Sequence, residues 1–66
     1  MEIKINDTPV ALPDGSSLAQ ALDYKNIIPK DIAVAVNGKV VPLKEISSFR
    51  LNDGDSVMII KAFYGG

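Results

Sequence analysis

Hydrophobic and polar residues alternate along the first twelve positions of the chain. Over residues 1–6 the alternation places Ile3 and Ile5 on one face of an extended strand. Turn-forming residues occupy 6–9, and residues 10–12 resume the alternation. The pattern predicts a β-hairpin at the start of the chain.

A short helical pattern follows this hairpin. Residues 13–15 break the strand, and Ser17 with Gln20 three positions later fits a capping box, the reciprocal pair that begins many helices. Apolar residues then recur at helical spacing at Leu18, Ala21 and Leu22. We expect a helix that lays one apolar stripe on a sheet and ends near residues 24–26.

The second half of the chain predicts three more strands. Residues 32–36 form a continuous apolar run, as in a strand inside a sheet. Asn37-Gly38 is a strong hairpin signal, because both positions tolerate positive φ, and the chain would return over 39–41. After Pro42 we expect at most one irregular helical turn at 43–48.

The last strand is predicted at residues 56–62, after a tight turn at 53–55. Its alternation puts Val57 and Ile59 on one face, and Met58 and Ile60 on the other. The Asp-Gly-Asp turn offers two carboxylates, too few for a calcium loop, whose ligands span about 12 residues, so we interpret it as structural.

The element order is strand, strand, helix, strand, strand, strand, which predicts an α+β fold. Its first and last strands would lie parallel at the centre of a mixed sheet of four to five strands, with the helix packed across one face. This is the ubiquitin-like β-grasp arrangement. We expect residues 1–66 to form a single domain, with 63–66 as a flexible C-terminal tail.

Composition narrows the possible functions of a chain of 66 residues. A hydrophobic content of 47% suffices for one core but not for an enclosed catalytic cavity as well. The sequence has no Cys and no His, so we expect no thiol nucleophile, no metal site built from these residues and no histidine for proton transfer.

Charge and hydropathy patterns bear on the partners. The net charge is −1 and the basic residues are scattered, whereas nucleic-acid binding needs them clustered. We find neither a signal-peptide pattern nor a run of about 20 apolar residues that could span a membrane. We therefore expect a cytoplasmic protein that is a monomer when free and binds neither nucleic acid nor membranes.

The candidate chemistry lies in the terminal Gly65-Gly66 pair. Two terminal glycines arise by chance in roughly one chain in 200. The pair indicates a function mainly because it follows the last strand of this fold. Glycine has no Cβ, which lets the backbone pass a narrow channel and approach a ligand closely. A frayed chain end is the alternative interpretation of the same two residues.

A possible docking surface lies next to this tail. Met58, Ile60 and Ala62 would form an apolar row on the sheet face away from the helix, and Met suits an adaptable interface. Phe63 and Tyr64 could add contact area for a partner, or pack back on the sheet. In the alternative interpretation, residues 43–49 fold over and cover part of the row with Leu43, Ile46 and Phe49.

Several segments, taken in order, resemble the thiamine-biosynthesis sulfur carrier family ThiS. They are Asn6-Asp7, Asp14-Gly15-Ser16-Ser17-Leu18, the run from Ala33 to Gly38 with Val41-Pro42, Leu51-Asn52-Asp53-Gly54-Asp55, and the closing Gly65-Gly66. The resemblance spans essentially the whole chain. Where that family usually shows Arg after the Val-Pro pair, this chain has Leu43.

The resemblance implies a function as a carrier and not as an enzyme, with no catalytic residues and no cofactor bound by this chain. A ThiF-type adenylating enzyme would activate the Gly66 carboxylate with ATP and magnesium, and Gly65 would give slim access. Sulfur from a cysteine desulfurase or sulfurtransferase would then leave a thiocarboxylate, which donates to a ThiG-type thiazole synthase. Met58, Ile60, Phe63 and Tyr64 would help to dock the body.

Three alternative functions remain open from the sequence. The chain could be a MoaD-like small subunit of molybdopterin synthase, which shares the tail and the sulfur chemistry. It could be a ubiquitin-like protein modifier that is joined to lysines through the same carboxylate. It could also be a non-catalytic interaction module, for which the two terminal glycines would be dispensable.

Overall fold

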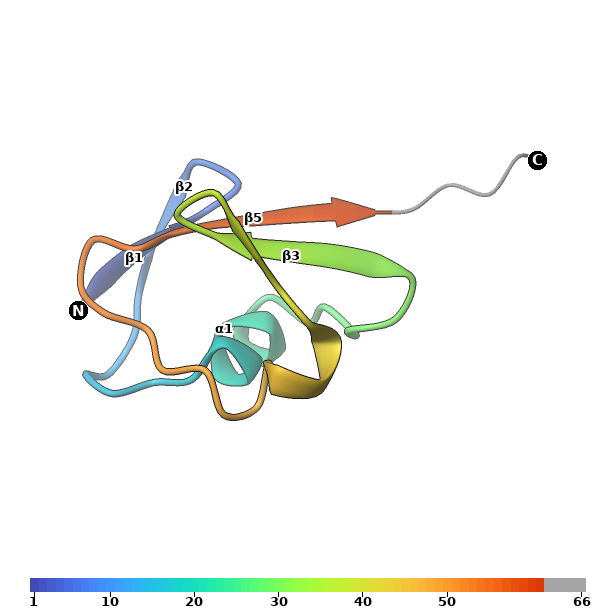
Figure 1. Cartoon of the computed structure of the whole chain (residues 1–66). Helices are drawn as coiled ribbons and strands as arrows, with labels where there is room; N and C mark the ends of the chain where they lie inside the picture. Colours follow the sequence, from blue (N-terminus) through green and yellow to red (C-terminus); the bar gives the residue numbers. More distant parts are fainter. Residues whose placement is uncertain (62–66) are drawn as a thin grey trace.

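The computed structural model describes residues 1–61, and Figure 1 shows their sheet lying above a single α-helix. The elements in chain order are β1 (Glu2–Ile5), β2 (Thr8–Ala11), α1 (Leu18–Tyr24), β3 (Ile32–Val36), β4 (Lys39–Val41), the 3-10 helix η1 (Leu43–Glu45) and β5 (Ser56–Lys61). The predicted order of strands and helix is confirmed.

The five strands form one mixed sheet in the order β2-β1-β5-β3-β4. The first and last strands are parallel neighbours, with Lys4 opposite Ser56 and Ile5 opposite Val57. All other neighbouring strands are antiparallel. The predicted parallel pair at the centre of the sheet is therefore confirmed, and the last strand lies between β1 and β3.

The first hairpin is tighter than the sequence predicts. Only Asn6 and Asp7 form the turn, with φ of 49° and 67°, and β2 already begins at Thr8. Pro9 was expected in the turn but lies in the strand, opposite Lys4. Proline is tolerated there because β2 is an edge strand, and this position turns its missing N–H away from β1.

The helix begins with the predicted capping box. The Gln20 side chain accepts a hydrogen bond from the Ser17 N–H at 2.7 Å, and the Ser17 hydroxyl accepts one from the Gln20 N–H at 3.2 Å. With seven residues, α1 is too short to be stable alone in water. It depends on burial of its apolar stripe, Leu18, Ala21 and Leu22, each at most 1% exposed.

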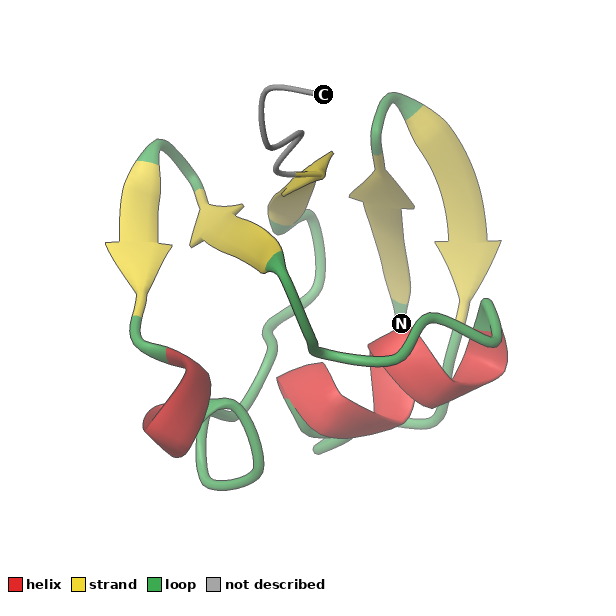
Figure 2. Ribbon diagram, turned by 90° about the vertical axis from the view of Figure 1, so that its right-hand side faces the viewer, coloured by secondary structure: helices red, strands yellow, loops and turns green. Residues whose placement is uncertain are grey.

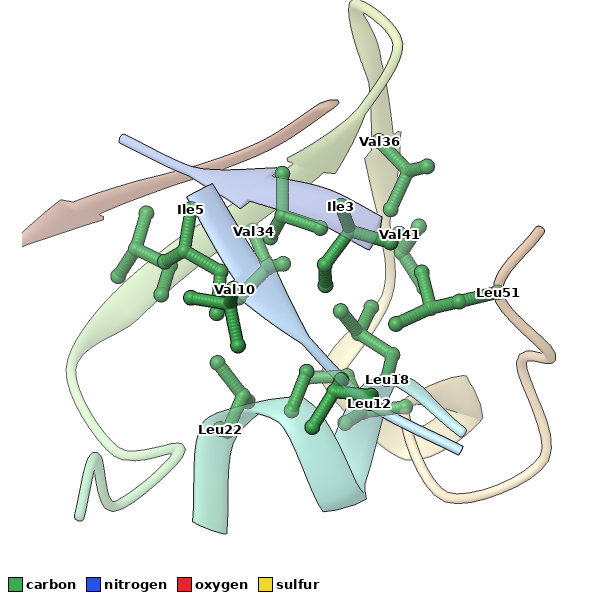
Figure 3. Packing of buried hydrophobic residues seen from close by; sticks show 14 residues of the cluster. Ile3, Ile5, Val10, Leu12, Leu18, Leu22, Val34, Val36, Val41 and Leu51 are labelled. Atoms are coloured by element: carbon green, nitrogen blue, oxygen red, sulfur yellow. The ribbon is translucent and has the colours of Figure 1, made fainter. Parts of the chain in front are cut away.

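The core fills the space between the sheet and α1 (Figure 3). Alternate residues of the strands point into it, including Ile3 and Ile5 from β1, Val34 from β3 and Val57 from β5. Figure 2 shows that both helical segments lie on the same side of the sheet. One face of the sheet is therefore covered, as predicted.

The second hairpin turns at Asn37-Gly38, with φ of 51° and 84°, which matches its sequence signal. The irregular turn expected at 43–48 is the three-residue η1, and the following Ile46 is buried in the core. Residue 62 of the predicted last strand lies outside the described residues. No helix within residues 1–61 is long and apolar enough to cross a membrane.

Asn6 joins the first hairpin to the last strand. Its N–H donates to the Val57 carbonyl at 2.9 Å, and its side-chain Oδ1 accepts from the Ile59 N–H at 2.8 Å. The side chain thus replaces the next backbone acceptor of the parallel ladder after β1 has ended. The sequence predicts Asn6 as a turn residue but gives no sign of this bond, which joins residues 53 apart in the chain.

Replacing Asn6 with Gly should expose the contribution of this bond. Asn6→Gly permits the positive φ but removes the acceptor, which leaves the Ile59 N–H unpaired at a residue only 8% exposed. We expect a loss of about 1–3 kcal/mol in the free energy of unfolding and faster hydrogen exchange at the Ile59 amide. Asn6→Asp retains an acceptor oxygen and serves as the control. Equal exchange rates at Ile59 in the two variants would contradict this role.

Candidate functional site: the end of β5 and the open face

The predicted site residues divide between β5 and the chain beyond it. Met58 and Ile60 lie on β5, whereas Phe63, Tyr64, Gly65 and Gly66 lie outside the described residues, as does the whole predicted tail at 63–66. The geometry of the site is therefore that of the strand leading into the tail and of the surface around it.

β5 has two neighbouring strands at its start and one at its end. β1 pairs with it only as far as Ile5 opposite Val57, whereas β3 pairs along it to Ile32 opposite Lys61. Figure 1 shows β3 and β5 running together past the β1–β2 hairpin. The predicted tail therefore follows a strand, β5, that is hydrogen-bonded to β1 and β3 at its start and to β3 at its end.

The sheet face away from α1 carries an apolar patch over β5, β3 and β4. Met58 is 45% exposed and Ile60 is 56% exposed, so both predicted docking residues are accessible. Residues directly opposite each other on neighbouring strands share a face. We call this patch the open face, and it consists of Ala33, Ala35, Val40, Met58 and Ile60.

The open face has a polar border on its β1 side. There Lys4 lies opposite Ser56 in the parallel pair, and both are exposed. Val40, on β4, is 73% exposed. The apolar part of this surface therefore lies over the strands that run toward the tail, while the β1 side is polar.

The alternative cover for this face, residues 43–49, packs elsewhere. Ile46 is 3% exposed within the core cluster, and Phe49 packs against the same cluster on the side of α1. Leu43 is 45% exposed. Ile46 and Phe49 therefore lie on the covered side of the sheet, and the alternative interpretation, in which these residues cover part of the apolar row, is wrong.

The carboxylates of the 53–55 turn are used in local hydrogen bonds. Asp53 accepts from the Glu2 N–H at 2.7 Å, which ties the turn to β1. Asp55 accepts from the Asn37 side-chain amide at 2.9 Å and from the Asn52 N–H at 2.8 Å. Residues 1–61 contain no group of three or more His, Cys, Asp or Glu side chains that could hold a metal ion.

A surface pocket of about 400 Å³ lies at the opposite end of β5 from the tail. Val41, Pro42 and Phe49 form much of its apolar lining, and Asn37 and Asp55 form part of its polar side. Those two polar side chains already bond to each other. The pocket is therefore distant from Lys61, the last described residue of β5.

Comparison with known proteins identifies the family. The model of the ThiS family matches residues 2–66, a range that includes both terminal glycines. No curated protein matches the chain.

Two solved structures from Geobacter metallireducens share the fold. One is a crystal structure of the thiamine biosynthesis protein ThiS, with a TM-score of 0.84, 20% identity and full coverage of both chains. The other is an NMR solution structure of a thiamine biosynthesis protein, with a TM-score of 0.76 and 20% identity, covering all of this chain and 88% of that chain. The predicted ubiquitin-like β-grasp fold is confirmed, and the chain belongs to the ThiS family.

Proposed function

We propose that this chain is a sulfur carrier for thiamine biosynthesis and that the Gly66 carboxylate is its working group. The observation that carries the proposal is the family match, which extends through Gly65 and Gly66 to the end of the sequence. A sulfur carrier needs a carboxylate on a thin stretch of chain, and in this sequence Gly65 and Gly66 follow shortly after β5.

The chemistry begins with activation of Gly66. A ThiF-type adenylating enzyme, which holds ATP and magnesium, directs the carboxylate at the α-phosphate, so that pyrophosphate leaves and an acyl-adenylate forms. Sulfur then attacks the acyl carbon and AMP leaves. If the sulfur arrives as a persulfide from a cysteine desulfurase or sulfurtransferase, a thiol must afterwards reduce the S–S bond to free the thiocarboxylate.

The thiocarboxylate then gives its sulfur to a ThiG-type thiazole synthase, which builds the thiazole ring of thiamine. In this scheme every catalytic group and the nucleotide site belong to a partner, so the chain is a co-substrate and not an enzyme. The sulfur of a thiocarboxylate is a better nucleophile than the carboxylate oxygen that it replaces. Activation of Gly66 is needed because the carboxylate cannot otherwise exchange this oxygen for sulfur.

The base of the tail supports delivery into a partner's site. β5 is paired with β3 along its length and is tied to the first hairpin through Asn6. From that fixed base, residues 63–66 can reach roughly 13 Å when extended. A carrier whose body is rigid loses less conformational entropy on binding, so the binding energy can be used to hold the terminus in place.

The open face is the proposed docking surface for the activating enzyme. It combines accessible apolar side chains, above all Met58 and Ile60, with a polar border at Lys4. An apolar centre with a polar rim is the usual anatomy of a protein interface. We propose that Phe63 and Tyr64, which follow β5 in sequence, add contact area on the same partner.

Deleting Gly66, or adding one residue after it, should abolish thiocarboxylate formation. The deletion leaves a shorter reach, and the extension moves the reactive carboxylate away from the α-phosphate, while neither change touches the core. Intact-mass spectrometry after incubation with the adenylating enzyme, ATP and a sulfide source measures the product. An oxygen-to-sulfur mass gain in the extended chain would refute the assignment of Gly66, provided that the unaltered chain shows the same gain.

Replacing both Met58 and Ile60 with Thr should weaken binding to the adenylating enzyme by about tenfold or more, because two central apolar contacts are lost. Thr retains a high β-propensity, and both residues are exposed, so the fold should persist. Ile28→Thr is the matched control, since Ile28 is 76% exposed but lies in the loop before β3. Titration calorimetry would count against the docking role if all three chains bound equally.

A further inference from the structure

The backbone of β5 points its hydrogen-bonding groups alternately toward β1 and toward β3. On the β1 side, the carbonyls of Asp55 and Val57 accept hydrogen bonds at 3.0 and 2.9 Å, and the Ile59 N–H donates to Asn6 at 2.8 Å. On the β3 side, the Ser56 carbonyl accepts a hydrogen bond at 2.8 Å from the turn before β4. Odd-numbered residues of this strand therefore face β1, and even-numbered residues face β3.

The same alternation places the Ile59 carbonyl and the N–H and carbonyl of Lys61 on the side of β1. Within residues 1–61, however, the β1 ladder reaches no further than Ile5 opposite Val57. Asn6 and the next residue then turn the chain away toward β2 with positive φ. The last part of β5 thus has β3 on one side and an open edge on the other, although it lies in the middle of the sheet.

Asn6 sets the point at which this edge begins. Its side-chain oxygen accepts the hydrogen bond of the Ile59 N–H. This N–H is the last donor on the β1 side of β5 that has a partner within the first hairpin. An ordinary strand residue at this position would let β1 continue alongside β5. The side-chain bond instead ends the ladder. The Ile59 carbonyl and the Lys61 N–H then follow with the spacing that a paired strand would require.

The geometry points to an added strand. We infer that an extended segment of the enzyme that activates Gly66 pairs with the open edge of β5 at Ile59 and Lys61, an inference that rests on the proposed function. Gly66 lies five residues after Lys61, roughly 16 Å when extended, so an enzyme that holds Gly66 lies close to the end of β5 and within reach of this edge. Main-chain pairing at a free sheet edge is a common way to capture a neighbouring chain.

The pairing would determine the direction in which the tail enters the enzyme. Ile59 and Lys61 offer acceptor, donor and acceptor in sequence, which matches one short strand and gives little affinity by itself. Because these groups immediately precede the tail, pairing them fixes the path of the chain toward Gly66. The open face supplies the larger contact area on the adjoining surface, with Ile60 between the two paired residues.

Hydrogen exchange tests the inference on the unaltered protein. In the free chain we expect the Lys61 amide to exchange quickly and the Ile60 amide, which faces β3, to exchange slowly. Addition of the adenylating enzyme with ATP should slow exchange at Lys61 by at least about tenfold. The amide of Ala11, which faces solvent on the outer edge of β2, is the internal control and should not change.

Unchanged exchange at Lys61 in the complex would overturn the inference. Protection of Lys61 that rises with the concentration of the isolated chain would also overturn it, because the occupant would then be a second copy of this protein.

A pair of variants measures the functional effect. Lys61→Pro removes the N–H at the open edge, and Lys61→Ala retains it while changing the side chain. We expect Lys61→Pro to weaken binding to the enzyme about tenfold or more, Lys61→Ala to change it less than about threefold, and Ala11→Pro, at the other edge position, to leave it unchanged. Equal affinities for the two Lys61 variants would contradict the inference.

ATP–pyrophosphate exchange measures adenylation of Gly66. It distinguishes a failure of the open-edge inference from a failure of the proposed function. If the unaltered chain supports pyrophosphate exchange but Lys61→Pro binds the enzyme as tightly as Lys61→Ala does, the open-edge inference fails and the proposed function stands. If the enzyme catalyses no pyrophosphate exchange with the unaltered chain, the proposed function fails, and the open-edge inference fails with it.

Discussion

A seven-residue helix packed on a five-stranded sheet is the contact on which the rest of this molecule depends. The helix is not stable by itself, and the sheet needs one apolar face covered, so each requires the other. Burial of Leu18 and Leu22 contributes roughly 1.5–3 kcal/mol for each side chain. Because α1 is the one α-helix within residues 1–61, it covers one face of the sheet, and Met58 and Ile60 are exposed on the other.

The position of the last strand connects this packing to the proposed function. β5 lies between β1 and β3, with Val57 and Ile59 directed into the core and Met58 and Ile60 directed outward. The strand that precedes the terminal residues is therefore paired on both sides at its start and with β3 at its end. In the proposed function, a partner bound at the open face would lie next to this strand and could therefore fix the position of Gly66.

The sequence predicted much of this arrangement because local signals and packing agree. Period-two alternation located β1 and β5, the Ser17–Gln20 pair located the start of α1, and Asn37-Gly38 located the second hairpin. Exposure of Met58 and Ile60 followed from the same alternation once one helix had been counted. Here short-range chemistry and the global fold favour the same structure.

Three features were beyond sequence reasoning because they depend on parts of the chain that are distant in sequence. The acceptor role of Asn6 requires Ile59, 53 residues away, and an Asn in a turn gives no sign of it. Pro9 indicates a turn by local chemistry, and only the position of β2 at the sheet edge makes a strand acceptable. The packing of Ile46 and Phe49 on the covered side also follows from the path of 43–55, which has little regular pattern.

If Gly66 carries sulfur, as we propose, the chemical state of the protein in cells should reveal it. The protein would be purified from cells supplied with sulfur, under conditions that preserve thiocarboxylates, and its C-terminal peptide analysed by mass spectrometry. The account predicts a population in which one oxygen of the Gly66 carboxylate is replaced by sulfur. A terminus found only as an unmodified carboxylate, while the cells are making thiamine, would contradict it.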